Sequence, residues 1–91
     1  MVQTAKHVIF RGRVQGVGFR FTSYNTAKRH DLTGLVRNLP DGTVEIIAQG
    51  DINAITDCIQ DLKKHFGSDI SEIKIEESPV NPEYGDFKIT F

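Results

Sequence analysis

The sequence predicts an α+β fold in which an antiparallel sheet carries two helices on one face. Several short stretches alternate apolar and polar residues, as half-buried strands do, and two others repeat their apolar residues at helical spacing. Pro40-Asp41-Gly42 is a strong signal for a tight turn between two strands. The resulting order is β-α-β-β-α-β plus a short C-terminal strand, which is the ferredoxin-like, split βαβ sandwich.

The first strand and the first helix flank a loop that contains glycines. The stretch from His7 to Val14 alternates, and its inward residues are Val8, Phe10 and Val14. A helix is expected after the loop and should end near His30-Asp31. The apolar residues that indicate this helix by their spacing are Phe21, Tyr24 and Ala27.

The next two strands should form a hairpin. We expect strands over Leu35–Leu39 and Thr43–Gln49, joined by the turn at Pro40-Asp41-Gly42. The inward residues of the later strand are Val44, Ile46 and Ala48. Asn38 lies two residues after Val36 and should therefore project to the same side of the sheet.

The second helix has the clearest signals. Asp51 is a good N-cap, because its carboxylate can accept the free N–H groups of the first turn. Gly67 can end the helix. One apolar stripe runs along it and consists of Ile55, Cys58, Ile59, Leu62 and Phe66. Two further strands follow, one marked by Ile73 and Ile75 and a last one by Phe87, Ile89 and Phe91, with Pro79 and Pro82 between them.

Length and composition predict one small domain over residues 1–91 and a cytoplasmic location. No apolar run approaches the ~20 residues that span a bilayer. The first six residues lack the apolar core of a secretion signal, and the single Cys58 cannot form an internal disulfide. Net charge is −1, so neither nucleic acid nor a membrane is an expected partner. However, residues 1–40 hold seven Lys and Arg against Asp31 alone, which places the anion-binding elements in this half.

The stretch from Gly12 to Arg20 combines a strand end, a glycine loop, an arginine and a helix start. Glycine permits positive φ angles, so backbone N–H groups can turn toward a ligand. The start of a helix adds unpaired N–H donors and the positive end of the helix dipole. The planar guanidinium of Arg20 can bind two phosphate oxygens at once. These features are compatible with an anion cradle, although on their own they fit a simple strand-to-helix connection better, since glycine loops are common in turns.

Two motifs in this region resemble those of the acylphosphatases. The first is Gly12-Arg13-Val14-Gln15-Gly16-Val17-Gly18-Phe19-Arg20. The second is Gly34-Leu35-Val36-Arg37-Asn38, continued by Leu39-Pro40-Asp41-Gly42-Thr43-Val44 and, after five residues, Gly50. Leu35 stands where the family more often has an aromatic residue, and Phe10 where an aliphatic residue is usual; both are expected to affect packing rather than chemistry.

The resemblance implies a small stand-alone acylphosphatase, which hydrolyses the carboxyl–phosphate anhydride of an acyl phosphate. By position, Arg20 would bind the phosphoryl group and Asn38 would orient the attacking water. The backbone cradle would be formed by Gln15, Gly16, Val17, Gly18 and Phe19. The resemblance implies a small-molecule substrate, and a monomer is the default expectation. Neither the resemblance nor the isolated histidines point to a metal or other cofactor. Arg37 is the strongest candidate for a secondary contribution, because it adjoins Asn38.

Two other functions remain open from the residues. One is a regulatory module on the same fold that binds small anions without turnover. The other is an RNA-binding domain, which reads bases with aromatic residues on an open sheet face. The inward position expected for Phe10 and the absence of aromatic residues from Thr43–Gln49 weigh against RNA. Cysteine-based phosphatase chemistry fits poorly, because Cys58 lies on the apolar stripe and no arginine follows closely.

Overall fold

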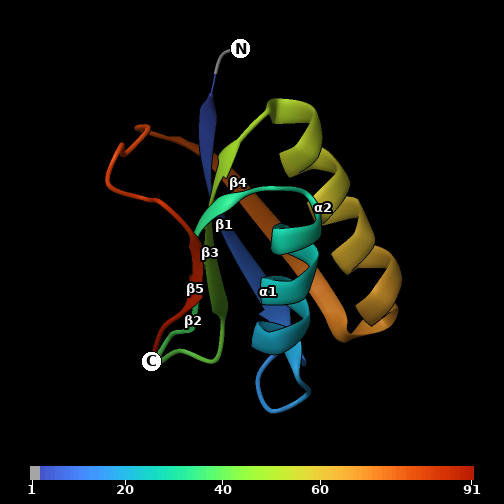
Figure 1. Cartoon of the computed structure of the whole chain (residues 1–91). Coiled ribbons are helices and arrows are strands. Elements are labelled where there is room, and N and C mark those ends of the chain that lie inside the picture. The colour runs from blue at the N-terminus through green and yellow to red at the C-terminus, as the bar shows by residue number, and fades with distance from the viewer. Residues whose placement is uncertain (1–2) are drawn as a thin grey trace.

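The computed structural model describes residues 3–91, so Met1 and Val2 of the expected domain and of the N-terminal stretch lie outside the described residues. The elements are β1 (Thr4–Gly12), α1 (Phe19–Arg29), β2 (Thr33–Asn38), β3 (Val44–Gly50), α2 (Ile52–Phe66), a short 3₁₀ turn (Gly67–Asp69), β4 (Ile70–Ser78) and β5 (Phe87–Ile89). This order confirms the prediction. Figure 1 shows both helices on the same side of a single sheet.

The sheet has the strand order β4-β1-β3-β2-β5. The pairs β4–β1, β1–β3 and β3–β2 are antiparallel, as predicted. The short β5 differs, because it pairs in parallel with β2 at the edge, with Val36 opposite Ile89. The sheet is therefore mixed. Parallel pairing follows from the long connection after β4, which crosses to the far edge of the sheet before β5 begins.

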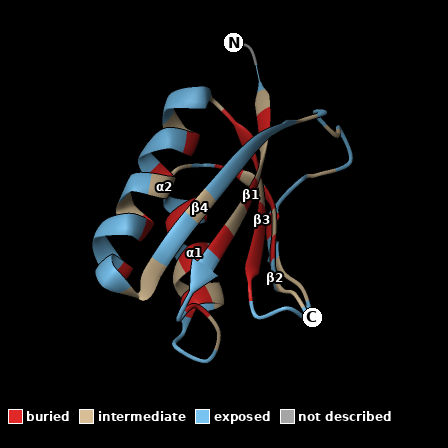
Figure 2. Ribbon diagram, turned by 180° about the vertical axis from the view of Figure 1, so that it is seen from behind, coloured by how far each residue is buried: buried red, intermediate tan, exposed pale blue. Residues whose placement is uncertain are grey.

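The core lies between the sheet and the two helices, where Figure 2 shows the buried residues. Phe19 links the layers: its ring centroid lies 4.9 Å from that of Phe10 on β1 and 4.5 Å from that of Phe66 on α2. Val8, Val36 and Val44 are also fully buried from the sheet side. The predicted inward residues of β1 and β3 are thus confirmed, although β1 ends at Gly12 and Val14 is buried in the loop that follows.

The predicted ends of α2 are also confirmed. The Asp51 carboxylate accepts hydrogen bonds from the N–H groups of Asn53 and Ala54, and Gly67 follows the last residue with a φ of +51°. Ile55, Cys58, Leu62 and Phe66 are buried, and Ile59 packs partly against them. Within residues 3–91, no helix is both long and apolar enough to cross a membrane.

The predicted apolar face of α1 is wrong in one residue. Phe21 is 64% exposed, and the buried face consists of Phe19, Ser23, Thr26 and Ala27. The reason is that Phe19 already fills the space between Phe10 and Phe66, and a residue two positions later points about 200° away around the helix. Positions 19, 23, 26 and 27 do have helical spacing in the sequence. Ser23 and Thr26 are polar, however, so a search for apolar residues at that spacing does not find this face.

Candidate active site

A pocket of about 220 Å³ lies at the end of the sheet where β1 leads into α1 and β2 turns toward β3. Its volume is several times the ~30 Å³ share of one water molecule. The residues that line it are Val14, Gly16, Gly18, Phe19, Arg20, Phe21, Asn38, Ile89 and Phe91. The fold therefore brings Arg20, Asn38 and both loop glycines to one pocket, from segments that are about 20 residues apart in the sequence.

The start of α1 offers free backbone donors to this pocket. Gly16 and Gly18 have φ angles of +77° and +78°, which L residues with side chains rarely adopt. Gly18 is the N-cap, and among residues 3–91 no side chain hydrogen-bonds to the N–H groups of the first turn. The helical bond from Thr22 N–H to Gly18 C=O is the first one, so the three preceding N–H groups have no partner within the helix. Such a helix start favours an anion.

Arg20 stands in the first turn of α1 and supplies the positive charge of the pocket. Its Cζ lies 4.9 Å from the centre of the Phe91 ring. Stacking of this kind holds the plane of a guanidinium and leaves the N–H groups at its edge free. Within the part of the chain that the structure describes, no carboxylate lies at ion-pair distance from Arg20. Its charge is therefore available to an anion from outside.

Asn38 is the last residue of β2 and lies opposite Val44 of β3. Its side-chain oxygen Oδ1 is buried, yet it accepts no hydrogen bond from any group of residues 3–91. A buried acceptor without a partner is costly, and such groups in native proteins call for a physical explanation. Asn38 lines the pocket, so rotation of its amide toward the pocket would let this oxygen accept from a water or ligand hydroxyl bound there.

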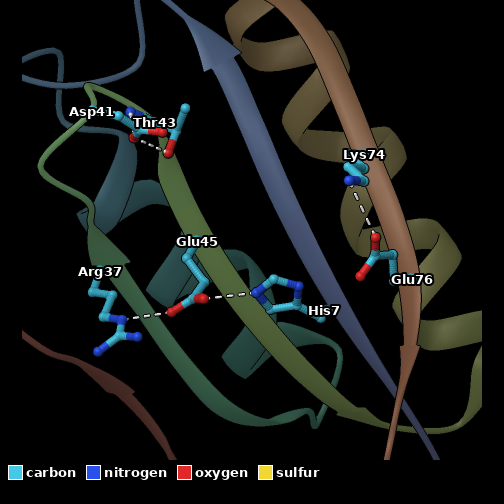
Figure 3. Close-up of polar contacts among 7 residues, drawn as sticks. All are labelled: His7, Arg37, Asp41, Thr43, Glu45, Lys74 and Glu76. Atoms are coloured by element: carbon cyan, nitrogen blue, oxygen red, sulfur yellow. Dashed lines mark hydrogen bonds and ion pairs between the residues drawn. The ribbon is translucent and has the colours of Figure 1, made fainter.

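Arg37 lies on the opposite face of β2 from Asn38 and does not line the pocket. Its Nε donates to Glu45 Oε1 over 2.5 Å, and His7 Nε2 lies 2.6 Å from Glu45 Oε2 (Figure 3). Burial opposes ionisation of Glu45, but the hydrogen bonds from His7 and Arg37 outweigh it and lower its pKa. Arg37 thus forms an ion pair on the open face of the sheet, away from the pocket.

The two arginines at the end of β1 and in the following loop, Arg11 and Arg13, also lie outside the pocket. The Arg11 side chain pairs with Glu72 at 3.1 Å on the neighbouring strand. Arg13 is exposed, and its backbone N–H donates to Asp69 C=O over 2.7 Å. Neither residue is among the residues that line the pocket. Arg20 is the arginine of the first half that the fold directs to the site.

Two residues of the predicted backbone cradle are not among the residues that line the pocket. Gln15 and Val17 do not line the pocket; Val17 is exposed, and the Gln15 side chain turns toward the β2–β3 turn. Conversely, Phe21, Ile89 and Phe91 line the pocket, whereas the sequence predicts only that they belong to the first helix and the last strand. No signal in the sequence indicates this for Phe91, because its place depends on β5 lying beside β2.

His30 and Cys58, two further titratable residues, lie outside the pocket. His30 Nε2 lies 2.9 Å from Asp61 Oδ2, between the end of α1 and the middle of α2. Burial raises the pKa of the Cys58 thiol to about 12, so it is inert at neutral pH. Among residues 3–91, no group of three His, Cys, Asp or Glu side chains is placed to hold a metal ion.

Comparison with known proteins agrees with this geometry. The acylphosphatase family model matches residues 6–89. An acylphosphatase from Chlorobaculum tepidum is 39% identical over 90 residues, which is 98% of both chains. The crystal structure of Bacillus subtilis acylphosphatase superposes with a TM-score of 0.88 and 34% identity, over 97% of this chain and 99% of that one. HypF from T. kodakarensis contains a similar part, with a TM-score of 0.84 and 34% identity, over 97% of this chain but 12% of HypF. The motifs, the pocket they build and these matches together show that the chain belongs to the acylphosphatase family.

Proposed function

We propose that residues 1–91 work as one domain that hydrolyses acyl phosphates to a carboxylate and inorganic phosphate. In this proposal Arg20 and the backbone N–H groups of Gln15–Phe19 hold the phosphoryl group, and Asn38 orients the attacking water. The observation that carries the proposal is the convergence of an unpaired arginine, an uncapped helix start and a buried amide oxygen on one pocket. Family membership supports the reaction class.

The proposed step is direct attack of water on phosphorus. A bond forms between the water oxygen and phosphorus, and the bond from phosphorus to the acyl oxygen breaks. The electron pair leaves with the carboxylate, whose conjugate acid has a pKa of about 4, as in an Asp or Glu side chain. The leaving group therefore needs no proton from the protein. The remaining requirements are charge stabilisation on the phosphoryl oxygens and placement of the water in line with the leaving group.

Each pocket residue can meet one of these requirements. The Arg20 guanidinium and the free N–H groups of the helix start present donors to the phosphoryl oxygens. With its amide turned toward the pocket, Asn38 Oδ1 can accept a hydrogen bond from water, which directs the oxygen lone pairs of that water toward phosphorus. No nucleophilic side chain is required, and we propose that no covalent phosphoenzyme forms. The phosphate of the substrate is one candidate acceptor for the proton of the water.

We also propose that the reaction needs no metal ion. The charge that a metal would otherwise neutralise is met by Arg20 and by backbone dipoles. Small carboxylic acyl phosphates and carbamoyl phosphate both present the phosphoryl group that the pocket would bind. The cytoplasmic location and the monomeric state stay predictions.

The test is hydrolysis of benzoyl phosphate in the presence of a chelator. Asn38→Ala should lower kcat by about a hundredfold or more while inorganic phosphate still binds, because positioning of a nucleophile contributes on this scale. Arg20→Ala should weaken both turnover and phosphate binding. Asn25→Ala and Arg29→Ala are matched controls, since both residues lie on α1 outside the pocket, and they should leave kcat unchanged.

A second readout tests the bond that breaks. In water enriched in ¹⁸O, attack on phosphorus places the label in phosphate, whereas attack on the carbonyl carbon places it in the carboxylate. Label in the carboxylate would overturn the mechanism. Phosphate binding without any turnover by the unaltered protein would instead identify the regulatory anion-binding module.

A further inference from the structure

The Gln15 side chain connects the two parts of the proposed active site. Gln15 lies in the loop between β1 and α1, yet its Nε2 reaches the β2–β3 turn. It lies 2.8 Å from the carbonyl oxygen of Leu39 and 2.8 Å from that of Thr43. One amide group has two N–H donors, so a single side chain satisfies both carbonyls.

These two carbonyls flank the residue that the proposed mechanism assigns to water. Leu39 follows Asn38 directly, and Thr43 precedes Val44, which pairs with Asn38 in the sheet. The Leu39 N–H also donates to Thr43 C=O over 2.9 Å. Gln15 therefore binds at the base of the turn, next to the point where β2 ends at Asn38.

Hydrogen bonds within the β2–β3 turn restrain its conformation, so the hydrogen bonds from Gln15 to the turn also restrain the position of Asn38. Asp41 Oδ1 accepts from the N–H of Thr43 over 3.0 Å and from its hydroxyl over 2.6 Å (Figure 3). Gly42 N–H donates to Leu39 C=O over 3.1 Å. These bonds restrain the conformation of the turn, which follows directly after β2 ends at Asn38.

The loop has a separate anchor on its other side. Arg13 N–H donates to Asp69 C=O over 2.7 Å, beside β4. Gly16, Gly18 and Arg20, which follow Gln15, then line the pocket. The loop is thus held to the 3₁₀ turn before β4 by the Arg13 N–H and to the β2–β3 turn by the Gln15 side chain.

We propose that Gln15 is a positioning residue, which sets the place of Asn38 relative to the phosphate cradle. This inference rests on the proposed function. Without the two hydrogen bonds, the cradle keeps Arg20 and its backbone donors, but the β2–β3 turn can shift against it. Misplacement of a nucleophile by about 1 Å can cost about a hundredfold in rate. Loss of Gln15 therefore lowers kcat much more than it weakens phosphate binding.

The experiment measures kcat for benzoyl phosphate and the inhibition constant of inorganic phosphate in two variants. Gln15→Ala removes the donors, and Gln15→Glu keeps the shape but sets a carboxylate against two carbonyl oxygens. In both, kcat should fall by about 10- to 100-fold, while the inhibition constant changes by less than about threefold. Gln49→Glu is the matched control. Gln49 also bonds backbone, at Asn81, but at the far end of β3, so its variant should keep the original kcat.

The pH dependence of Gln15→Glu separates positioning from a general loss of stability. A protonated carboxylic acid regains one O–H donor. The kcat of Gln15→Glu relative to the unaltered protein should therefore rise as the pH falls through the pKa of the introduced acid. The same ratio for Gln15→Ala should stay flat. A flat ratio for both variants would overturn the proposal.

A double-mutant cycle tests whether Gln15 acts through Asn38. In the Asn38→Ala background, Gln15→Ala should lower the residual kcat by less than about threefold, because the group it positions is gone. A full additional loss, an unchanged kcat in the single variant, or an equal loss of phosphate affinity would each overturn the positioning role. If the unaltered protein itself shows no hydrolysis, the proposed function falls, and this inference falls with it.

Discussion

The two helices begin in opposite ways. At α2, the Asp51 carboxylate accepts from two N–H groups of the first turn, so the helix start is satisfied from within the chain. At α1, Gly18 occupies the same position with a φ of +78°, and no side chain of residues 3–91 caps the turn. Their last turns are similar, since both carry basic residues that suit the negative end of the helix dipole. The two helices therefore differ at their N-termini, where the first turn of α2 is capped by a side chain and that of α1 is open to the pocket.

The comparison indicates a division of roles. The α2 helix contributes stability through its cap and its apolar stripe, with Ile55, Cys58, Leu62 and Phe66 buried. The α1 helix buries two small polar side chains, Ser23 and Thr26, and presents its N-terminus and Arg20 to the pocket. A glycine N-cap such as Gly18 costs only about a few tenths of a kcal/mol of stability relative to a good side-chain cap. In the proposed function, that open start is the part that binds phosphate.

Of these predictions, the largest change is expected in kcat/KM when α1 is given an acidic N-cap like that of α2. Gly18→Asp places a carboxylate at the start of α1, where it competes with phosphate for the N–H donors and repels it. We expect kcat/KM for benzoyl phosphate to fall by about a hundredfold. Gly18→Asn is the matched control, because it has the same backbone requirement and a similar side chain without the charge. The Asp variant should be at least about tenfold worse than the Asn variant; equal activities would contradict an anion site at this helix start.

Removing the cap of α2 should affect stability alone. Asp51→Ala leaves the N–H groups of Asn53 and Ala54 without their acceptor, at a cost of about 1 kcal/mol in the free energy of unfolding. For a protein of this size, that corresponds to a Tm lower by about 4–8 °C. Benzoyl phosphate turnover below the transition should stay within about twofold. Asp51→Asn, which keeps an acceptor oxygen, should recover most of the Tm; a loss of activity at unchanged Tm would break the division of roles.

Removal of the contact between His30 and Asp61, which joins the two helices, should cause the smallest change in Tm, and this change should depend on pH. The hydrogen bond from His30 lowers the pKa of Asp61 below its ordinary value of 3.8. A carboxyl with a lowered folded pKa stabilises fully above its unfolded pKa, and this stabilisation disappears as the pH falls through the folded value. Asp61 is on the surface, so solvent screens the pair.

The Tm values of the unaltered protein and of Asp61→Asn should therefore differ at pH 5 and converge as the pH falls below the lowered pKa of Asp61. The Tm difference should be smaller than that of Asp51→Ala. Asp57→Asn, an exposed acid of the same helix, is the control and should show no such convergence. A Tm difference that persists at low pH would assign the effect to something other than the charge of Asp61.

Local signals explain which elements could be predicted. The Asp51 cap, the stripe from Ile55 to Phe66 and the Asp41-Gly42 turn each depend on residues within one or two turns of chain, and all three are confirmed. The face of α1 was mistaken at Phe21, because burial of Ser23 and Thr26 depends on the sheet and on α2. The parallel pairing of β5 could not be predicted either, since it depends on where the connection from β4 returns to the sheet.

The amino-acid sequence by itself determined the order of the elements, the glycine loop before Arg20 and the family motifs that include Asn38. These depend on local backbone preference and on the period of apolar residues. Only the tertiary structure decided that Arg37 turns to Glu45, that Phe91 stacks on Arg20 and that Gln15 bonds the turn next to Asn38. The physical reason is that such contacts join residues 8 to 71 positions apart in the sequence, which come within contact distance only once the sheet and helices have packed.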